Sequence, residues 1–116
     1  MMTTTLVLTA LLACIAPAAA SDGPVSPEAK RWHPDRNWLR GAFCIHRHES
    51  INWHIHNHPY ANGMQFLLST WIRAGGRAEW WITAGPREQL YRAYVIWRSH
   101  GGSWSEWSTR GRCGLA

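Results

Sequence analysis

The chain has 116 residues, and its composition is that of a small, basic and tryptophan-rich protein. It holds 12 Lys and Arg residues against 7 Asp and Glu, so its formal net charge of +5 indicates an anionic partner. This length suits one small domain with a modest core. Nine Trp residues are enough both to fill that core and to stack on the apolar faces of sugars.

Residues 1–20 are predicted to be a signal peptide and no part of the fold. Residues 6–19 form an apolar stretch without charge, and residues 18–20, all Ala, suit cleavage by signal peptidase. The stretch is too short to span a bilayer as a helix, so we expect no stable membrane insertion. A second interpretation is a lipoprotein signal with Cys14 as the lipid anchor. Both interpretations predict an exported protein, secreted or held at the cell wall.

The first helix is predicted from Asp35 to Ser50, after an exposed lead-in over residues 21–34 that is rich in Pro, Ser and charge. Residues at spacings of three and four lie on one face of a helix and mark its buried side. In this segment the buried stripe consists of Trp38, Ala42, Ile45 and Glu49. Arg40 and Arg47 fall away from it.

Two further helices are predicted from their capping residues. One runs from Leu68 to Ala74, where a pair of glycines ends it. The other has Gly85 as N-cap, Pro86 at its first position and Glu88 at its third, and continues to His100 before another glycine pair. Its apolar face is expected to carry Leu90, Ala93, Tyr94 and Trp97.

Residues 51–66, between the first two helices, are rich in turn-forming residues. They could form a small β-hairpin with Asn62-Gly63 as its turn. The predicted fold is therefore mainly α with a minor β-hairpin, an α+β class, in a single small domain.

Glu49 is the best candidate for a catalytic acid. A carboxyl that protonates a glycosidic oxygen must keep its proton near neutral pH, which requires an apolar setting. Glu49 ends the apolar stripe and Trp53 follows it closely. Its alternative role is that of a surface residue in the last turn of a helix. The other carboxylates occupy the lead-in, helix starts, a connection or the tail: Asp22, Glu28, Asp35, Glu79, Glu88 and Glu106.

The order of these residues resembles the transglycosylase-like domain of resuscitation-promoting factors, a lysozyme-like family that acts on peptidoglycan. Glu49-Ser50 is similar to the family's catalytic Glu-Ser pair, Asn52-Trp53 to its Asn-Trp pair, and residues 60–66 to its Tyr-Tyr-Gly-Gly-Leu-Gln-Phe segment. The resemblance covers about residues 38–113 and implies a lysozyme-like domain over residues 35–116. It implies Glu49 as the catalytic residue and these substrate-binding residues: Trp53, Asn57, Tyr60, Gln65, Thr70 and Trp71.

Two cysteines follow the signal, and in an exported domain Cys44 and Cys113 are expected to form a disulfide. Three alternating histidines, His54, His56 and His58, would share one face of an extended segment. A closed zinc site needs a fourth ligand, and using Glu49 would remove the acid, so we predict no metal and no cofactor. The histidines are instead expected to be a solvated rim that gains charge as pH falls through about 6.5.

The predicted function is that of an exported peptidoglycan-cleaving enzyme that acts on the β-1,4 bond between N-acetylmuramic acid and N-acetylglucosamine. Lacking an obvious second carboxylate, the sequence favours a lytic transglycosylase, which forms a 1,6-anhydro product. The alternatives are a muramidase-type hydrolase and a non-catalytic module that binds cell-wall glycan. We expect a monomer whose partners are glycan strands and the anionic wall, and no nucleic acid.

Overall fold

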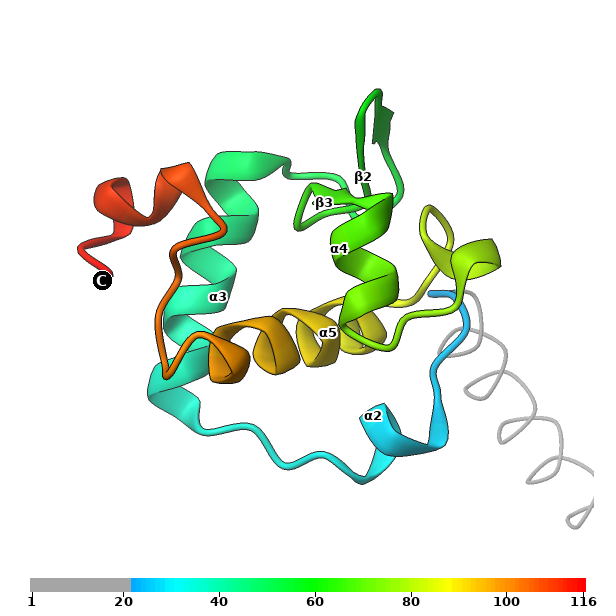
Figure 1. The fold of residues 1–116 in the computed structure, drawn as a ribbon, viewed down its shortest axis with the longest axis horizontal. Helices are drawn as coiled ribbons and strands as arrows, with labels where there is room; N and C mark the ends of the chain where they lie inside the picture. The colour runs from blue at the N-terminus through cyan, green and yellow to red at the C-terminus, as the bar shows by residue number, and fades with distance from the viewer. Residues whose placement is uncertain (1–21) are drawn as a thin grey trace, which may run out of the picture.

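The structure, a computed structural model, describes residues 22–116, so the predicted signal peptide and Cys14 lie outside the described residues. This part of the chain is one small, mainly helical domain with a three-stranded antiparallel sheet, which confirms the predicted α class with a minor β element (Figure 1). No helix in it is both long and apolar enough to cross a membrane. The α-helices are α2 (Pro27–Arg31), α3 (Arg36–Glu49), α4 (Leu68–Arg73) and α5 (Pro86–Ser99). Two 3-10 helices, η1 (Ala78–Trp80) and η2 (Ser108–Cys113), and the strands β1 (His56–Asn57), β2 (Tyr60–Ala61) and β3 (Phe66–Leu67) complete the order.

Helix α3 forms where it was predicted. The side chain of Asp35 caps its first turn by accepting a hydrogen bond from the Trp38 backbone N–H at 3.0 Å. Of the predicted stripe, Trp38, Ala42 and Ile45 are buried, and α5 runs across this side of α3 in Figure 1. Glu49, the last residue of the helix, is half-buried at the end of that stripe.

Helices α4 and α5 also confirm their predicted capping residues. Gly75, with φ of +85°, ends the turn that follows α4. At Gly76 a Cβ atom would lie only 2.4 Å from the indole of Trp71, so the chain approaches that ring too closely for any other residue. Gly85 and Pro86 begin α5, and Gly101, with φ of +67°, follows its C-terminal end.

The β element is larger than the predicted hairpin. Tyr60 and Ala61 of β2 pair with β3, through a turn over residues 62–65 that contains the predicted Asn62-Gly63. They also pair with β1, so the sheet order is β1-β2-β3. The third strand was not predicted because β1 has two exposed residues and no hydrophobic alternation.

Part of the predicted exposed lead-in, residues 26–31, packs against the rest of the domain. Ser26 caps α2, and Ala29 is fully buried. The buried carboxylate of Glu88 on α5 accepts a hydrogen bond from the Ser26 backbone N–H at 2.7 Å and another from Arg92 Nε at 2.7 Å. Arg92 in turn donates to the backbone oxygen of Ala74 at 3.1 Å and to Ser26 Oγ at 3.2 Å. This buried ion pair therefore joins α2 and the end of α4 to α5.

Aromatic rings build much of the core. Trp38 stacks on Trp104 with ring centroids 5.3 Å apart and contacts Tyr94 edge to face. Around Phe66, the rings of Trp71 and Trp107 pack edge to face at 5.3 and 5.7 Å. Such contacts add specific geometry to the free energy of burying large apolar surfaces. Much of the tryptophan content is thereby explained by packing.

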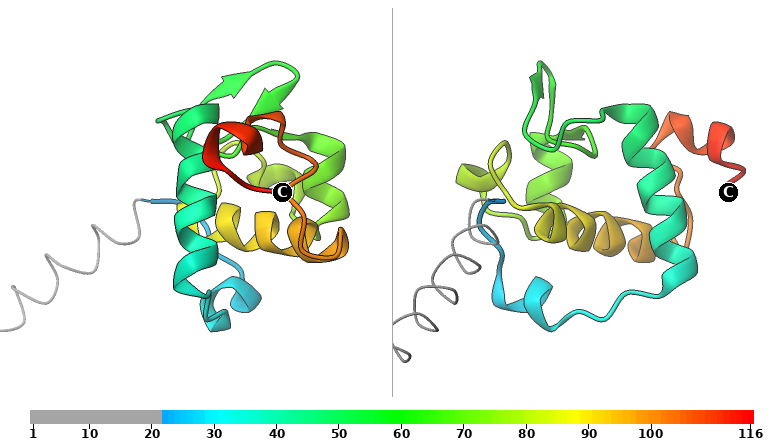
Figure 2. Two further views of the ribbon diagram at one scale, coloured as in Figure 1. Left: turned by 90° about the vertical axis from the view of Figure 1, so that its left-hand side faces the viewer. Right: turned by 180° about the vertical axis from the view of Figure 1, so that it is seen from behind.

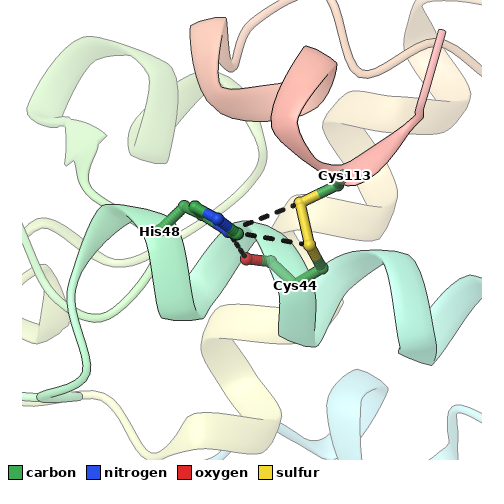
Figure 3. A group of neighbouring side chains, drawn as sticks. All are labelled: Cys44, His48 and Cys113. Carbon is green, nitrogen blue, oxygen red and sulfur yellow. Dashed lines mark hydrogen bonds between the residues drawn. A yellow bond between two sulfur atoms is a disulfide. The ribbon is translucent and has the colours of Figure 1, made fainter.

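The predicted pairing of Cys44 with Cys113 is confirmed, with an S–S distance of 2.10 Å. Figure 3 shows that the bridge ties the middle of α3 to the end of η2, and both views of Figure 2 place η2 beside α3. Nδ1 of His48, one turn further along α3, lies 2.9 Å from the carbonyl oxygen of Cys44. The same atom lies 3.6 and 3.7 Å from the two sulfurs. The bridge thus fixes η2 next to the helix end that carries Glu49.

Candidate active site

Glu49 is oriented by a residue far away in the sequence. Its Oε2 accepts a hydrogen bond from the Thr109 hydroxyl at 2.7 Å, and Thr109 belongs to η2. Because the disulfide holds η2 against α3, the hydroxyl is placed beside the carboxyl by a covalent link a few residues away. The predicted disulfide indicated that the C-terminal segment lies near α3. Nothing in the sequence indicated that Thr109 is the residue that bonds Glu49.

A small pocket of about 90 Å³ lies between the sheet, the start of α4 and the segment before η2. Three predicted substrate-binding residues, Tyr60, Gln65 and Thr70, line it together. Glu49 does not line this pocket, and its partner Thr109 follows pocket-lining Trp107 by two residues in the sequence. The structure thus gathers half of the predicted binding set in one pocket.

The other three predicted binding residues lie elsewhere. Trp71 was wrongly predicted to bind substrate, because its side chain is fully buried and its Nε1 donates to the backbone oxygen of Arg77. Trp53 stacks face to face on His46 of α3, with ring centroids 3.6 Å apart, and does not line the pocket. Asn57 is exposed on β1, at the sheet edge away from β3 and also outside the pocket lining.

Two buried side-chain amides fix the loop that carries Gln65. Asn62 donates from Nδ2 to the backbone oxygen of Trp81 at 2.9 Å and accepts from the Met64 N–H at 3.0 Å. Gln89 of α5 accepts from the Gly63 N–H at 2.8 Å and donates to the backbone oxygen of Trp53 at 2.9 Å. This was not predicted, because a Gln in the first turn of a helix gives no sign of burial.

Gln65 itself has a backbone conformation that is uncommon for its type, with φ of +52°. Its backbone N–H and its side-chain Nε2 both donate to the backbone oxygen of Asn62, at 3.2 and 2.8 Å. Left-handed conformations of residues other than Gly cost free energy and often occur at functional sites. The turn therefore holds Gln65 in one position at the pocket wall.

His46 supports the same loop from α3. Its Nδ1 lies 2.7 Å from the backbone oxygen of Gly63, so the neutral ring carries its proton on Nδ1 and donates it. Burial lowers the pKa of His46, and the charge of Arg47 lowers it further, while the hydrogen bond to Gly63 acts in the opposite direction. The folded domain therefore contains a histidine that resists protonation.

This histidine predicts a loss of stability in mild acid. Because the folded pKa of His46 is lowered, the unfolded chain binds the proton first as pH falls below about 6.5, and the free energy of unfolding decreases from there to the folded pKa. Chemical denaturation at pH 7.5 and 5.5 measures this slope. His46→Gln should flatten it, whereas His58→Gln, which changes an exposed turn residue, should keep it. A slope unchanged by His46→Gln would contradict the assignment.

The three alternating histidines do not converge. Nε2 of His54 lies 3.1 Å from the backbone oxygen of Ala84, while His56 packs edge to face against Trp81. Within residues 22–116, only Cys44, His48 and Cys113 bring three potential metal ligands together, and those two sulfurs are bonded to each other. The solvated rim formed by the histidines stays a prediction.

Nothing in the sequence indicated that Glu106 belongs to the pocket. It was assigned to a Ser-rich tail, but it lines the same pocket as Tyr60, Gln65 and Thr70. Its Oε1 is 2.5 Å from Arg73 Nη2 and 3.0 Å from His100 Nε2. The pocket thus has one carboxylate, Glu106, in its wall.

Comparisons of the chain with known protein families, with curated proteins and with solved structures find no match. A half-buried carboxyl held by a hydroxyl can deliver a proton. The pocket offers an exposed aromatic ring, a fixed amide and an ion-paired carboxylate, which are groups that bind polar ligands with apolar faces.

Proposed function

We propose that the protein is an exported, lysozyme-like enzyme that cleaves peptidoglycan, with Glu49 as the acid that protonates the glycosidic oxygen. The observation that carries this proposal is the hydrogen bond that orients the Glu49 carboxyl at the end of the buried face of α3. The carboxyl is half-buried there and is held by Thr109. General acid catalysis needs such a positioned group within reach of the leaving oxygen.

The pocket lined by Tyr60, Gln65 and Thr70 supports a glycan as substrate. The Tyr60 side chain is 43% exposed, so its ring can stack on the apolar face of a sugar. Since Gln65 uses its Nε2 to bond Asn62, its side-chain oxygen is the atom left to accept a hydrogen bond. The acetamido N–H of an N-acetyl sugar is a donor of this kind. These contacts would place the bond between N-acetylmuramic acid and N-acetylglucosamine beside Glu49.

The reaction proposed first is that of a lytic transglycosylase. Glu49 gives its proton to the leaving oxygen as the glycosidic bond breaks. The 6-hydroxyl of the muramyl residue then attacks the anomeric carbon and returns its proton to the Glu49 carboxylate, which leaves a 1,6-anhydro end. Hydrolysis by water is the second candidate, because Glu106 is a second carboxylate in the pocket wall that could act on a water molecule.

Digestion of purified sacculi tests the proposal. Mass spectrometry of the soluble products should find 1,6-anhydromuramyl ends. Reducing ends in their place would establish the hydrolase. Binding to sacculi without any soluble product would instead support a non-catalytic glycan-binding module and reject the enzyme.

A further inference from the structure

The outer face of α3 carries a row of arginines that the site does not use. Helical spacing places Arg36, Arg40 and Arg47 on one side of the helix, with Phe43 between them. The row is about 16 Å long at the rise of an α-helix. Together with Leu39, these residues line an open groove of about 550 Å³, in which the Phe43 side chain is 39% exposed.

These three arginines have no protein partner in the described chain. All three are exposed, and over residues 22–116 none of them forms a salt bridge or a side-chain hydrogen bond. By contrast, Arg73, Arg77 and Arg92 each pair with a carboxylate. A row of unpaired guanidinium groups is a site for anions, because each group can bind a carboxylate through two parallel hydrogen bonds.

The row and the candidate acid lie on opposite sides of one helix. Glu49 continues the buried stripe of Trp38, Ala42 and Ile45, and successive residues of a helix advance by about 100°. The row therefore faces away from the core side, on which Glu49 meets Thr109. A glycan segment bound for cleavage cannot at the same time lie along the arginines.

We propose that this row, defined by Arg36, Arg40 and Arg47, tethers the enzyme to the wall by binding the free carboxylates of peptidoglycan peptide stems on a strand other than the one being cleaved. The choice of peptidoglycan as the bound polymer rests on the proposed function. The choice of the arginine row as the binding surface rests on charge complementarity. A membrane is a poorer partner, since Phe43 is the only aromatic ring in the groove.

Binding to a carboxylate polymer tests the surface without requiring cleavage. Labelled poly-L-glutamate at low salt should bind the wild-type chain, and Arg36→Gln/Arg40→Gln/Arg47→Gln should weaken binding by roughly tenfold or more. The matched control is Arg31→Gln/Arg98→Gln/Arg112→Gln, which removes the same charge from exposed positions on α2, α5 and η2. We expect this control to weaken binding by less than about threefold, because its arginines do not form a row.

Sacculi test the chemistry of the partner. Amidation of their free carboxylates should lower wild-type binding to the level of the row variant and should not lower the binding of that variant further. Cleavage of peptide-free glycan chains should be unchanged in the row variant, which separates tethering from catalysis. If no chain is cleaved while the row still binds polyglutamate and intact sacculi, the enzyme proposal fails and the surface proposal stands.

Two results would overturn the tether. Equal losses in the row variant and the matched control would show that only the net charge matters. A larger loss on anionic phospholipid vesicles than on sacculi would assign the row to a membrane surface instead.

Discussion

Replacing Glu49 by Gln should abolish the cleavage of peptidoglycan and leave the fold intact. The amide cannot supply an acidic proton, and general acid catalysis contributes about 10²- to 10⁴-fold to rates of this kind. The amide can still accept the hydrogen bond from Thr109, so the end of α3 should stay in place. The rate of release of soluble muropeptides measures the loss, while thermal unfolding and binding to sacculi should match the wild-type protein.

Two other carboxylates make this experiment specific. Glu79 is exposed and pairs with Arg77, so Glu79→Gln should keep full activity. Glu106→Gln changes the pocket wall and should reduce the rate by less than Glu49→Gln does. Loss of cleavage in Glu106→Gln with near-normal rates in Glu49→Gln would transfer the role of acid to Glu106.

Replacing Glu88 by Ala should destabilise the domain more than any surface change. The substitution leaves the Arg92 guanidinium buried without its carboxylate and the Ser26 backbone N–H without its acceptor. Removing one partner of a buried ion pair typically costs about 3–5 kcal/mol. In a domain of this size, that cost should lower the melting temperature by more than about 10 °C. Thermal unfolding followed by circular dichroism measures the shift.

Two comparisons show whether the buried charge is the cause. Glu88→Gln keeps one acceptor oxygen, which can serve either the Ser26 N–H or Arg92 Nε but not both, so it should fall between the wild type and Glu88→Ala. Glu79→Ala breaks an exposed ion pair and should change the free energy of unfolding by less than about 1 kcal/mol. A Glu88→Ala variant that melts within a few degrees of the wild type would show that the network is dispensable.

Signals that act within a few residues were sufficient to predict helices α3, α4 and α5. At the start of α3, the Asp35 side chain accepts a hydrogen bond from a free backbone N–H. At the start of α5, Pro86 has no N–H that would need a partner. Both effects are the same whatever the helix packs against. The disulfide was predictable for a different reason, since only two cysteines remain once the signal is set aside. Both inferences need no knowledge of the tertiary arrangement.

Long-range burial could not be inferred from the same local signals. Glu88 was explained by its place at a helix start, yet its partner Ser26 is 62 residues away and buries it. Trp71 illustrates the same limit, because an indole next to polar residues suits a binding cleft and a core equally well. Thr109 and Glu106 became part of the site only through the path of the C-terminal segment.

The stacked aromatic rings give the two halves of α3 separate optical signals. The rings of Trp38 and Trp104 are tilted by 25° with centroids 5.3 Å apart, which is close enough for their excited states to couple and to produce an exciton band in circular dichroism. Near the other end, Trp53 lies on the imidazole of His46, and protonation of that ring would quench the indole emission. Loosening at either end of the helix could therefore be followed in the unlabelled protein, by dichroism at one end and by fluorescence at the other.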